Sequence, residues 1–290
     1  MDFELVIGDR YTSSWSLRGW LLFEKFGIKN RLRHVTFADD RSVAEQMPEF
    51  SPAKTVPAMR TPEGVVVGDS LAIAEELASR YPDAGILPKD PAARSVARFL
   101  MAEMHVGFGD LRTDCPMNLR VAYRDIAVPN GVKNDVRRLE KLWSYARRTT
   151  GAKGPWLCGN YGAVDAFFAP VAARIAGYSL DVGPEAAAYV AAHLDDTAFR
   201  RWRAMGLVKG ANLPWYERDH TQIFWPGPTP LAATNAKGPS ENSTCPYSGQ
   251  EVTDFLSIEG RVFGFCNAFC RDKTRADPTA WPAFMNIYQS

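Results

Sequence analysis

The segment Lys54-Thr55-Val56-Pro57-Ala58-Met59 is the most informative part of the sequence for the fold. Pro57 stands at the start of an apparent strand, where a proline cannot donate a hydrogen bond to a sheet ladder. A cis bond before Pro57 would turn the backbone groups of Val56 outward, toward the backbone of a peptide-like ligand. Because an edge-strand proline explains the same residues, the flanking sequence must separate the two interpretations.

Upstream of this segment the pattern predicts a βαβ unit. Glu4–Gly8 is typical of a short buried strand, and Tyr11–Ser14 is a hydroxyl-rich turn that leads into an amphipathic helix from Trp15 to Phe26. Leu32–Thr36 alternates as a second strand does. A polar stretch over residues 39–50, expected to be helical, completes this part.

Downstream, the pattern predicts a hairpin and a helix. Val65–Val67 is expected to pair with the strand at Val56, through the turn Thr61–Gly64. Asp69 and Ser70 are good N-cap residues for the helix that follows them. Residues 1–85 are therefore predicted to form one α/β domain with the element order βαβαββα.

The rest of the chain divides into three parts. After a proline-punctuated boundary near residues 82–91, the pattern predicts an all-α domain over residues 90–215, with helices at 92–105, 133–149, 163–176 and 184–205. Residues 216–243 are Pro-rich and polar, which predicts an extended linker. Residues 244–290 contain three of the five cysteines and are predicted to form a small separate domain.

Charge and cysteine usage restrict the classes of partner. The 34 Lys and Arg residues nearly balance the 33 Asp and Glu residues, so the chain has no global field for nucleic acid or anionic lipid. The first residues carry acid rather than Lys or Arg, and no apolar run approaches the ~18 residues of a membrane span. We expect a soluble, cytoplasmic protein that binds small molecules, without nucleic acid or membrane partners. Five cysteines are an odd number and are spread unevenly, which does not fit a secreted disulfide framework. The two isolated ones, Cys115 and Cys158, are interpreted as packed thiols.

The hydroxyl-rich turn, the Val-Pro pair and the Asp-Ser pair at a helix start occur in one order, which resembles the cytosolic glutathione transferase superfamily. The turn Tyr11–Arg18 is similar to the Ser-rich zeta-type motif, although it lacks the cysteine of that motif. The resemblance covers residues 1–215. It implies a thioredoxin-like first domain, a homodimer, and a glutathione pocket around Thr55-Val56-Pro57 in which the first helix presents its N-terminus to the glutathione sulfur.

Four hydroxyl groups are candidates for stabilising the glutathione thiolate. A thiolate at the orphan N–H groups of a helix, where the dipole places about +0.5 charge, is favoured over the thiol. Ser13 is the first candidate for a hydroxyl donor, followed by Ser14, Thr12 and Tyr11. Aligning Arg18 with the arginine that closes the family motif would instead put Tyr11 or Thr12 at the catalytic position. Ser13 or Ser14 can also be a plain N-cap.

The resemblance implies which residues hold the rest of glutathione. Val56, beside Pro57, would bind through backbone atoms alone. Asp69 would take the γ-glutamyl ammonium, and Ser70 with its helix N-terminus would take the carboxylate, although plain capping explains both residues as well. Lys54 is positioned to reach the glycyl carboxylate or to remain solvated.

Three further residues have roles that the sequence leaves partly open. Gly162–Asp165 resembles the family's helix-capping motif, but glycine replaces the usual hydroxyl residue, so half of the reciprocal cap is missing. Asp165 is interpreted as structural. Arg18 and Arg174 serve either folding or substrate binding.

The candidate metal ligands are Cys245, Cys266 and Cys270. On a helix, a spacing of four places the last two thiols on one face, within reach of one ion. The strand expected at Val262–Phe265 and the turn at Glu259-Gly260 predict a small ββα knuckle. Zn²⁺ is the default ion and Cu(I) also suits three thiolates. The alternatives are free thiols or a disulfide between the last two cysteines.

This last segment resembles the TRASH and YHS group of metal-binding domains. The resemblance rests on Cys245–Gly249, on the spacing Cys-x20-Cys-x3-Cys, and on Asp277-Pro278 with Trp281 at the end. A fold of about 46 residues needs a staple, which a thiolate-bound ion would supply. Three sulfurs leave a fourth position for water, a ligand or a side chain, for which His220 is the candidate.

Two functions follow from these predictions. The first is a glutathione-dependent transferase, which activates the glutathione thiol for attack on a small electrophile or for isomerisation of one. The alternative is a non-catalytic protein of the same fold that acts as a metal sensor, a metal carrier or a protein-binding scaffold. No motif encodes the electrophile, because helices of the second domain are expected to line that side of the pocket.

Overall fold

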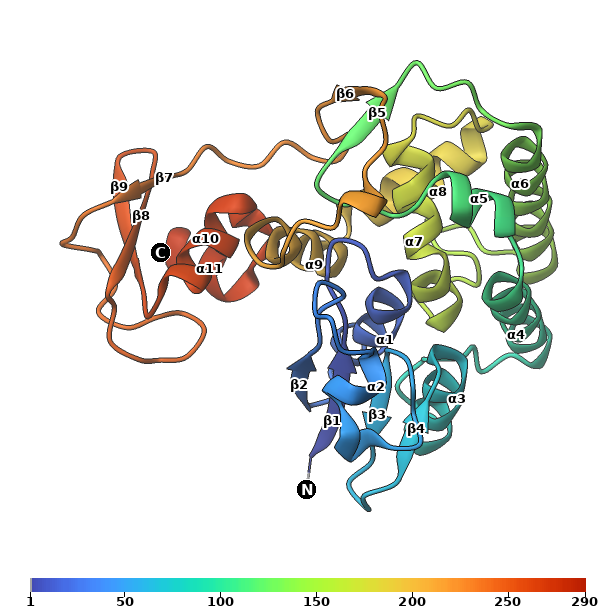
Figure 1. Ribbon diagram of the computed structural model, residues 1–290, viewed down its shortest axis with the longest axis horizontal. Coiled ribbons are helices and arrows are strands. Elements are labelled where there is room, and N and C mark those ends of the chain that lie inside the picture. The colour runs from blue at the N-terminus through green and yellow to red at the C-terminus, as the bar shows by residue number, and fades with distance from the viewer. Residues whose placement is uncertain (1) are drawn as a thin grey trace. The chain divides into compact units, whose positions relative to one another are not determined.

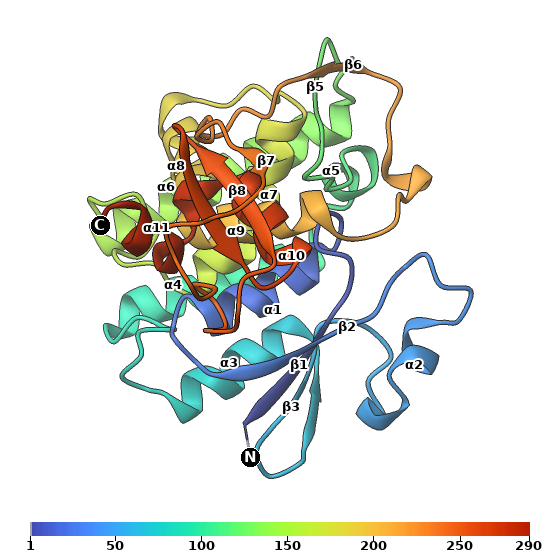
Figure 2. The same cartoon turned by 90° about the vertical axis from the view of Figure 1, so that its left-hand side faces the viewer.

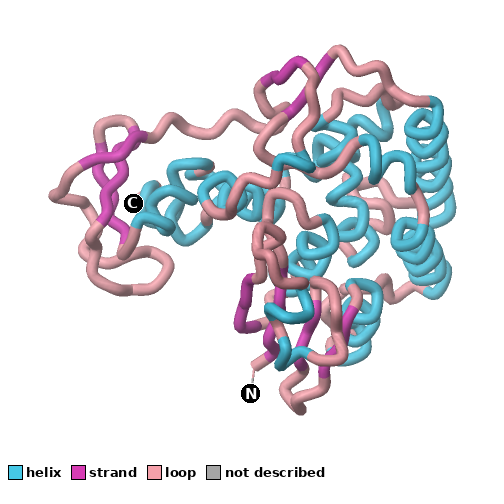
Figure 3. The backbone as a smooth tube through the Cα atoms, viewed as in Figure 1, coloured by secondary structure: helices cyan, strands magenta, loops and turns pink. Residues whose placement is uncertain are grey.

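The computed structural model describes residues 2–290 as two compact units (Figure 1). Unit 1 runs to Leu194 and includes Ala211–Pro226, whereas unit 2 comprises Asp195–Gly210 and Gly227–Ser290. The backbone therefore passes between the units three times. The described strands form three separate sheets, which are magenta in Figure 3.

Unit 1 begins with a thioredoxin-like sheet. Its strand order is β2 (Asn30–His34), β1 (Phe3–Ile7), β3 (Ala58–Arg60) and β4 (Val66–Gly68). β1 and β2 are parallel, as a βαβ unit requires, and β3 runs antiparallel to both β1 and β4. The predicted hairpin before β4 is confirmed: its turn contains Gly64 at φ +91°, a conformation that glycine adopts without strain.

Helices cover both faces of this sheet (Figure 2). α1 (Ser14–Glu24) and α3 (Ser70–Arg80) pack on one face, while α2 (Val43–Gln46) and the 3-10 turn η1 (Pro48–Phe50) lie on the other. The segment before β3 lies close against α1, because a Cβ atom added at Gly19 would be only 2.8 Å from Pro57. Glycine at position 19 therefore lets the Val-Pro segment approach the first helix.

The remainder of unit 1 is mainly helical. Its helices are α4 (Pro91–Val106), α5 (Gly109–Asp114), α6 (Asn130–Thr150), α7 (Ala163–Gly177) and α8 (Pro184–Asp195). α7 is buried along almost its whole length and packs on α1 and α4. At its start, Asp165 accepts a hydrogen bond from the backbone N–H of Gly162 at 2.9 Å, and glycine has no side chain to return it. The half-cap predicted from the sequence is present.

The single helix expected over residues 184–205 is in fact two helices. α8 ends at Asp195, and α9 (Thr197–Val208) begins after Asp196. The Asp196 carboxylate accepts hydrogen bonds from the backbone N–H groups of Ala198 and Phe199. Aspartate favours such an N-cap over a helix interior, which is why the helical pattern is interrupted here.

Residues 211–226, which we call the strap, are part of unit 1. They contain the 3-10 turn η2 (Pro214–Tyr216) and β6 (Thr221–Ile223), which pairs antiparallel with β5 (Ala122–Arg124). The sequence predicted an extended linker from residue 216, and the paired strand corrects that expectation for its first part. Three-residue strands are too short to produce a period-2 pattern, so the pairing was missed.

Unit 2 contains the sheet β7 (Thr234–Ala236), β8 (Asp254–Ile258) and β9 (Arg261–Phe265), followed by α10 (Ala268–Ala276), the 3-10 turn η3 (Pro278–Ala280) and α11 (Pro282–Tyr288). β8 and β9 are joined by the predicted two-residue turn, with Glu259 at φ +49° and Gly260 at φ +81°. Both values are typical of a tight hairpin. β7, inside the expected linker, is the third strand.

α9 enlarges the core of unit 2. It packs on α10, and its Arg200 donates two hydrogen bonds to the carboxylate of Asp277, at 2.8 and 2.6 Å. Trp202 of α9 is fully buried, as are Phe263 and Phe265 of β9. The unit therefore has more core than the 244–290 segment alone supplies. Within the described chain, no helix is both long and apolar enough to cross a membrane.

Candidate functional site

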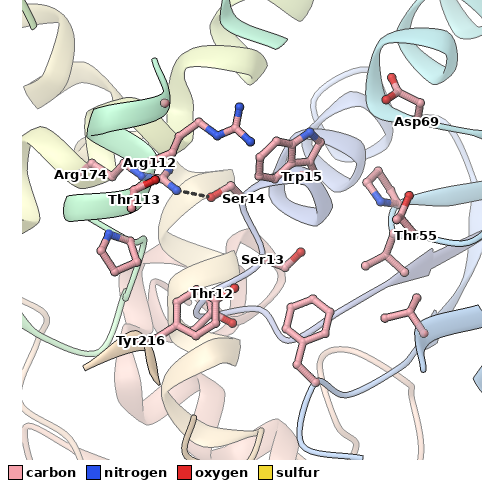
Figure 4. Close-up of a pocket in the computed structure, with 16 residues that line it drawn as sticks. Thr12, Ser13, Ser14, Trp15, Thr55, Asp69, Arg112, Thr113, Arg174 and Tyr216 are labelled. Carbon is pink, nitrogen blue, oxygen red and sulfur yellow. Dashed lines mark hydrogen bonds between the residues drawn. The ribbon is translucent and has the colours of Figure 1, made fainter. Parts of the chain in front are cut away.

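A cavity of about 610 Å³ lies beside the N-terminus of α1 in unit 1 (Figure 4). One side is formed by the segment before β3 and by Asp69 at the start of α3. The other side is formed by α5, by Arg174 of α7 and by Tyr216 of the strap. The predicted site residues that line it are Thr12, Ser13, Ser14, Val56, Pro57 and Asp69. Tyr11, Lys54 and Ser70 are not among the lining residues.

Ser13 is both the N-cap of α1 and a cavity residue. Its Oγ accepts a hydrogen bond from the backbone N–H of Ser16 at 3.3 Å and donates to the Ser16 Oγ at 2.8 Å. The Ser16 Oγ in turn accepts from the backbone N–H of Gly8 at 2.9 Å. This network fixes the turn between β1 and α1. Ser13 is therefore an N-cap and, as a cavity residue, also remains the first candidate for a donor to the thiolate.

The Ser14 hydroxyl is hydrogen-bonded to Arg174. The Nη2 of Arg174 donates to the Ser14 Oγ at 3.0 Å, and its Nη1 donates to the carbonyl of Pro170 at 3.1 Å. Arg174 is only 5% exposed, and burial lowers its pKa to about 10. A guanidinium cannot lose its proton at neutral pH, so Ser14 holds a buried cation at the cavity wall.

Thr12 and Tyr11 differ sharply in their surroundings. Thr12 is 2% exposed and lines the cavity, and its Oγ1 has no hydrogen-bond partner within residues 2–290. Tyr11 is equally buried, but its hydroxyl donates to the carbonyl of Ala211 at 3.0 Å. The Arg120 guanidinium lies 3.8 Å from the centroid of the Tyr11 ring. Tyr11 therefore anchors the strap.

On the opposite side of the cavity, the Val56–Pro57 peptide bond is cis, and Val56 lies two residues before Ala58, the first paired residue of β3. Asp69 is the N-cap of α3: its Oδ1 accepts from the backbone N–H of Leu71 at 2.7 Å. Its Oδ2 lies 3.2 Å from the Nε2 of His105.

Two predicted residues on this side lie outside the cavity wall. Ser70 is fully buried behind Asp69, and its Oγ has no partner among the described residues. Lys54 is exposed.

Among the cavity residues that sequence reasoning missed are Trp15, Arg112 and Tyr216. Trp15 lies between two cations, with the Arg112 guanidinium 4.4 Å and the Arg18 guanidinium 5.1 Å from its ring centroid. Arg18 is fully buried, and burial lowers its pKa to about 9. No local pattern signals Arg112 or Tyr216, because each reaches the cavity only through tertiary packing.

The three clustered cysteines of unit 2 meet in space. The Sγ atoms of Cys245, Cys266 and Cys270 all lie within 4.8 Å of one another, and the last two are 3.9 Å apart. The expectation that Cys266 and Cys270 share a helix face is wrong, since Cys266 lies between β9 and α10. Asn267 is the N-cap of α10 and accepts from the backbone N–H of Cys270 at 2.9 Å, so the helix starts only after Cys266.

The surroundings of these thiols fit a thiophilic ion. The Oγ of Ser248 and the Nδ2 of Asn267 each donate to the Cys266 Sγ at 3.3 Å. Burial raises the pKa of Cys245, but backbone hydrogen bonds, the largest from Cys266, outweigh it and lower the pKa to about 7. Such donors stabilise thiolates, which are the form that binds metal. The other candidate ligand, His220, packs against Tyr123 in unit 1, with ring centroids 5.7 Å apart.

A cation lies close to the same cluster. Burial raises the pKa of Cys270 to about 12, while the Lys273 ammonium opposes this increase. The Nζ of Lys273 is 3.8 Å from the centroid of Tyr247 and 4.2 Å from that of Trp281. An ammonium held by aromatic rings can offset the negative charge that three thiolates bring to one ion.

Comparisons with known proteins agree with the fold of unit 1. Residues 12–80 match the family described as "Glutathione S-transferase, N-terminal domain". A maleylacetoacetate isomerase from Dictyostelium discoideum is 27% identical over 92 residues, which are 32% of this chain and 42% of that protein. A maleylacetoacetate isomerase from Rattus norvegicus is 31% identical over 93 residues, which are 31% and 42% of the two chains. The matches thus span less than half the length of these relatives.

Solved structures extend the likeness to the helical part. A glutathione transferase homolog from Burkholderia gl BGR1, with bound glutathione, has a TM-score of 0.54 and 22% identity, and the match covers 71% of this chain and 98% of that one. Glutathione transferase Omega 2S from Trametes versicolor has a TM-score of 0.55 and 18% identity, with 74% and 99% covered. At these identities the likeness establishes the fold.

Fold and cavity together define a protein with the glutathione transferase fold. Residues 12–80 are similar to the glutathione S-transferase N-terminal domain, and about 90 residues of the chain are similar to the two maleylacetoacetate isomerases. The cysteine cluster of unit 2 is an addition to that fold and could hold a metal ion.

Proposed function

We propose that unit 1 binds glutathione along the N-terminus of α1 and activates its thiol for attack on a small electrophile. The observation that carries this proposal is the cavity itself, which joins Ser13 at a helix N-terminus to Val56 and Asp69. The first N–H groups of α1 would stabilise the thiolate, and so would the hydroxyl of Ser13 once it turns its proton from the Ser16 Oγ to the sulfur. The backbone of Val56, the carboxylate of Asp69 and the start of α3 would hold the peptide, with Lys54 available to the glycyl end.

Binding of glutathione can be measured by isothermal titration calorimetry. We expect Asp69→Asn to weaken binding about 10-fold, because a charge-assisted hydrogen bond to the γ-glutamyl ammonium is replaced by a neutral one. Asparagine is also a good N-cap, so α3 should keep its start. Asp83→Asn, at an exposed acid paired with Lys89, is the matched control and should bind as the unchanged protein does. A protein that binds no glutathione up to about 10 mM, well above usual KM values, would contradict the proposal.

The electrophile is proposed to carry a carboxylate. Arg174 and Arg112 line the far side of the cavity, and none of the described salt bridges involves either of them. A buried guanidinium without a carboxylate partner is costly to maintain, and an anionic substrate would supply the missing charge. The printed name of both curated relatives is an isomerase of a keto acid, which supports an unsaturated keto acid as the substrate class.

With such a substrate, isomerisation would follow from addition and loss of the same thiolate. Glutathione would add to the carbon–carbon double bond, the resulting single bond would rotate, and elimination would restore the double bond and the thiolate. Positioning and thiolate stabilisation carry this chemistry.

Replacing Arg174 tests the anionic substrate. We expect Arg174→Met to raise the KM for the anionic enone 3-benzoylacrylate by about 10- to 100-fold, the equivalent of one hydrogen-bonded charge pair. The neutral enone 4-phenyl-3-buten-2-one should change by less than about 3-fold, since it offers no carboxylate. Arg124→Met, at an exposed arginine of β5, is the control. Equal losses for both enones would show that Arg174 only supports the fold.

A second proposed function concerns the cysteine cluster. Three thiols within 4.8 Å of one another support a metal site in which Cys245, Cys266 and Cys270 bind Zn²⁺ or Cu(I). The similarity to the TRASH and YHS group points the same way. In this alternative the transferase fold is a sensor, carrier or scaffold and the bound ion is the functional ligand. The ion would supply a staple to unit 2 and a Lewis-acidic centre.

A further inference from the structure

We propose that Tyr216 and Thr12 form a hydroxyl pair that donates hydrogen bonds to the substrate oxygen on which negative charge develops. The inference rests on the proposed glutathione-dependent function and names two residues for its electrophile side. The sequence predicts neither role, since it offers Thr12 only as a candidate partner of the sulfur and places Tyr216 in the expected linker.

Thr12 provides the first observation. A buried hydroxyl is usually hydrogen-bonded, because a buried polar group without a partner lowers the stability of the fold. The Thr12 Oγ1 is buried and unpaired among the described residues, yet the residue lines the cavity. Its backbone N–H donates to the carbonyl of Asp9, so the backbone donor has a hydrogen-bond partner and only the side-chain hydroxyl lacks one. Because Thr12 lines the cavity, a ligand bound there can supply the partner that its hydroxyl lacks.

Tyr216 provides the second observation. The strap brings this residue from a distant part of the sequence to the cavity wall. Several contacts hold the strap against the rest of unit 1. Leu213 is buried, and the Arg218 side chain donates to the carbonyl of Thr113 at 3.1 Å. The backbone N–H of Arg218 also donates to the hydroxyl of Tyr123 at 3.2 Å. Tyr216 is thus placed by a fixed segment.

The charges around Tyr216 suit a hydrogen-bond donor. Burial raises the pKa of the Tyr216 phenol, while the Arg174 guanidinium opposes that increase. The net direction is upward, so the phenol keeps its proton at neutral pH and can donate it. Arg174 itself is positioned for the substrate carboxylate, which leaves the phenol for a second oxygen of the same molecule.

The arrangement in the cavity separates the two halves of the reaction. In Figure 4, Thr55 and Asp69 lie on one side of Ser13, whereas Thr12 and Tyr216 lie on its other side. Glutathione bound along the first side would present its sulfur near Ser13. An electrophile approaching that sulfur would then have its carbonyl on the side of Thr12 and Tyr216.

The chemistry of an unsaturated ketone needs such donors. The thiolate forms a carbon–sulfur bond at the β-carbon, and the π electrons of the double bond move to give an enolate oxygen. Hydrogen bonds from the two hydroxyls stabilise that oxygen without transferring a proton. When the enolate collapses, the carbon–sulfur bond breaks and its electron pair returns to sulfur. No oxidant, reductant or net proton is required.

Two carboxylate substrates distinguish this role from general packing. 3-Benzoylacrylate forms an enolate on addition of glutathione, whereas 4-(chloromethyl)benzoate releases chloride by direct displacement and forms none. We expect Tyr216→Phe to lower kcat/KM for 3-benzoylacrylate by about 10- to 100-fold and Thr12→Val by about 10-fold, because one donor remains in each variant. For 4-(chloromethyl)benzoate both variants should stay within about twofold of the unchanged protein.

Controls keep the outcomes separate. Phenylalanine retains the ring of Tyr216, and Tyr145→Phe, at an exposed tyrosine of α6, is the matched control. Glutathione affinity, measured by calorimetry, should be the same in all variants. Equal losses for both substrates, or no loss for either, would overturn the hydroxyl pair while glutathione binding still supports the proposed function. Failure of the unchanged protein to bind glutathione would overturn both.

Discussion

Replacing Ser13 with alanine should lower kcat/KM for 3-benzoylacrylate by about 100- to 1,000-fold, the usual cost of one preorganised donor at a developing or stabilised charge. Ser13 is the N-cap of α1, and its Oγ accepts a hydrogen bond from the backbone N–H of Ser16. Without the hydroxyl, the pKa of bound glutathione should rise and less thiolate should be present at neutral pH. The ultraviolet absorbance of the bound thiolate measures this directly.

Because Ser13 is also an N-cap, its loss should cost about 1 kcal/mol of stability in addition. Asp90→Ala removes the N-cap of α4, whose carboxylate accepts from the backbone N–H of Ala93 at 2.8 Å, and lies outside the cavity. It should lose similar stability and no activity. Ser13→Thr keeps both hydroxyl and cap, so it should restore thiolate absorbance. Full activity in Ser13→Ala would transfer the role to another hydroxyl of the turn.

Replacing Cys266 with serine should reduce the metal in the purified full-length protein from about one equivalent to less than a tenth, because a hydroxyl is a poor ligand for thiophilic ions. Cys266 is the half-buried member of the cluster, so serine is accommodated there with little repacking. Inductively coupled plasma mass spectrometry measures the content, and competition with a chromophoric chelator measures the affinity.

Cys158→Ser is the matched control for the metal experiment. Cys158 is a free, half-buried thiol of unit 1, and burial raises its pKa to about 12. The control should retain the full metal content. Chelation should loosen unit 2 without unfolding it completely, since Trp202 and Phe263 are fully buried there and are not candidate metal ligands. A preparation without transition metal, which also takes up neither Zn²⁺ nor Cu(I), would contradict the site.

The features that the sequence predicts well are local. The βαβ unit, the Val56–Pro57 segment and the Asp69 cap each depend on a few consecutive residues, whose periodicity or turn chemistry is legible without tertiary context. The cysteine spacing is legible for the same reason. The spacing of the two cysteines does not reveal that Asn267 is the N-cap and that the helix begins only after Cys266. The position of the N-cap depends on the backbone geometry at the end of β9.

The features that escape prediction depend on packing between distant segments. Arg112 lies on a six-residue helix that is too short to show a helical period, and Tyr216 lies at the start of the predicted linker. The division of labour among the hydroxyls is equally invisible in the string Tyr11–Ser14. The roles differ because the Ser14 hydroxyl is hydrogen-bonded to Arg174 and the Tyr11 hydroxyl to the Ala211 carbonyl. The Thr12 hydroxyl has no partner among the described residues.

The path of the backbone between the units determines which parts of the protein a truncation removes. A stop codon after Leu194 would remove not only the cysteine cluster but also the strap, and with it Tyr216 and the hydrogen-bond acceptor of Tyr11. A stop after Pro226 would spare the strap but leave α9 without the helix it packs on. The segment with the three clustered cysteines therefore cannot be removed at a single point of the chain without also removing either the strap or the helix on which α9 packs.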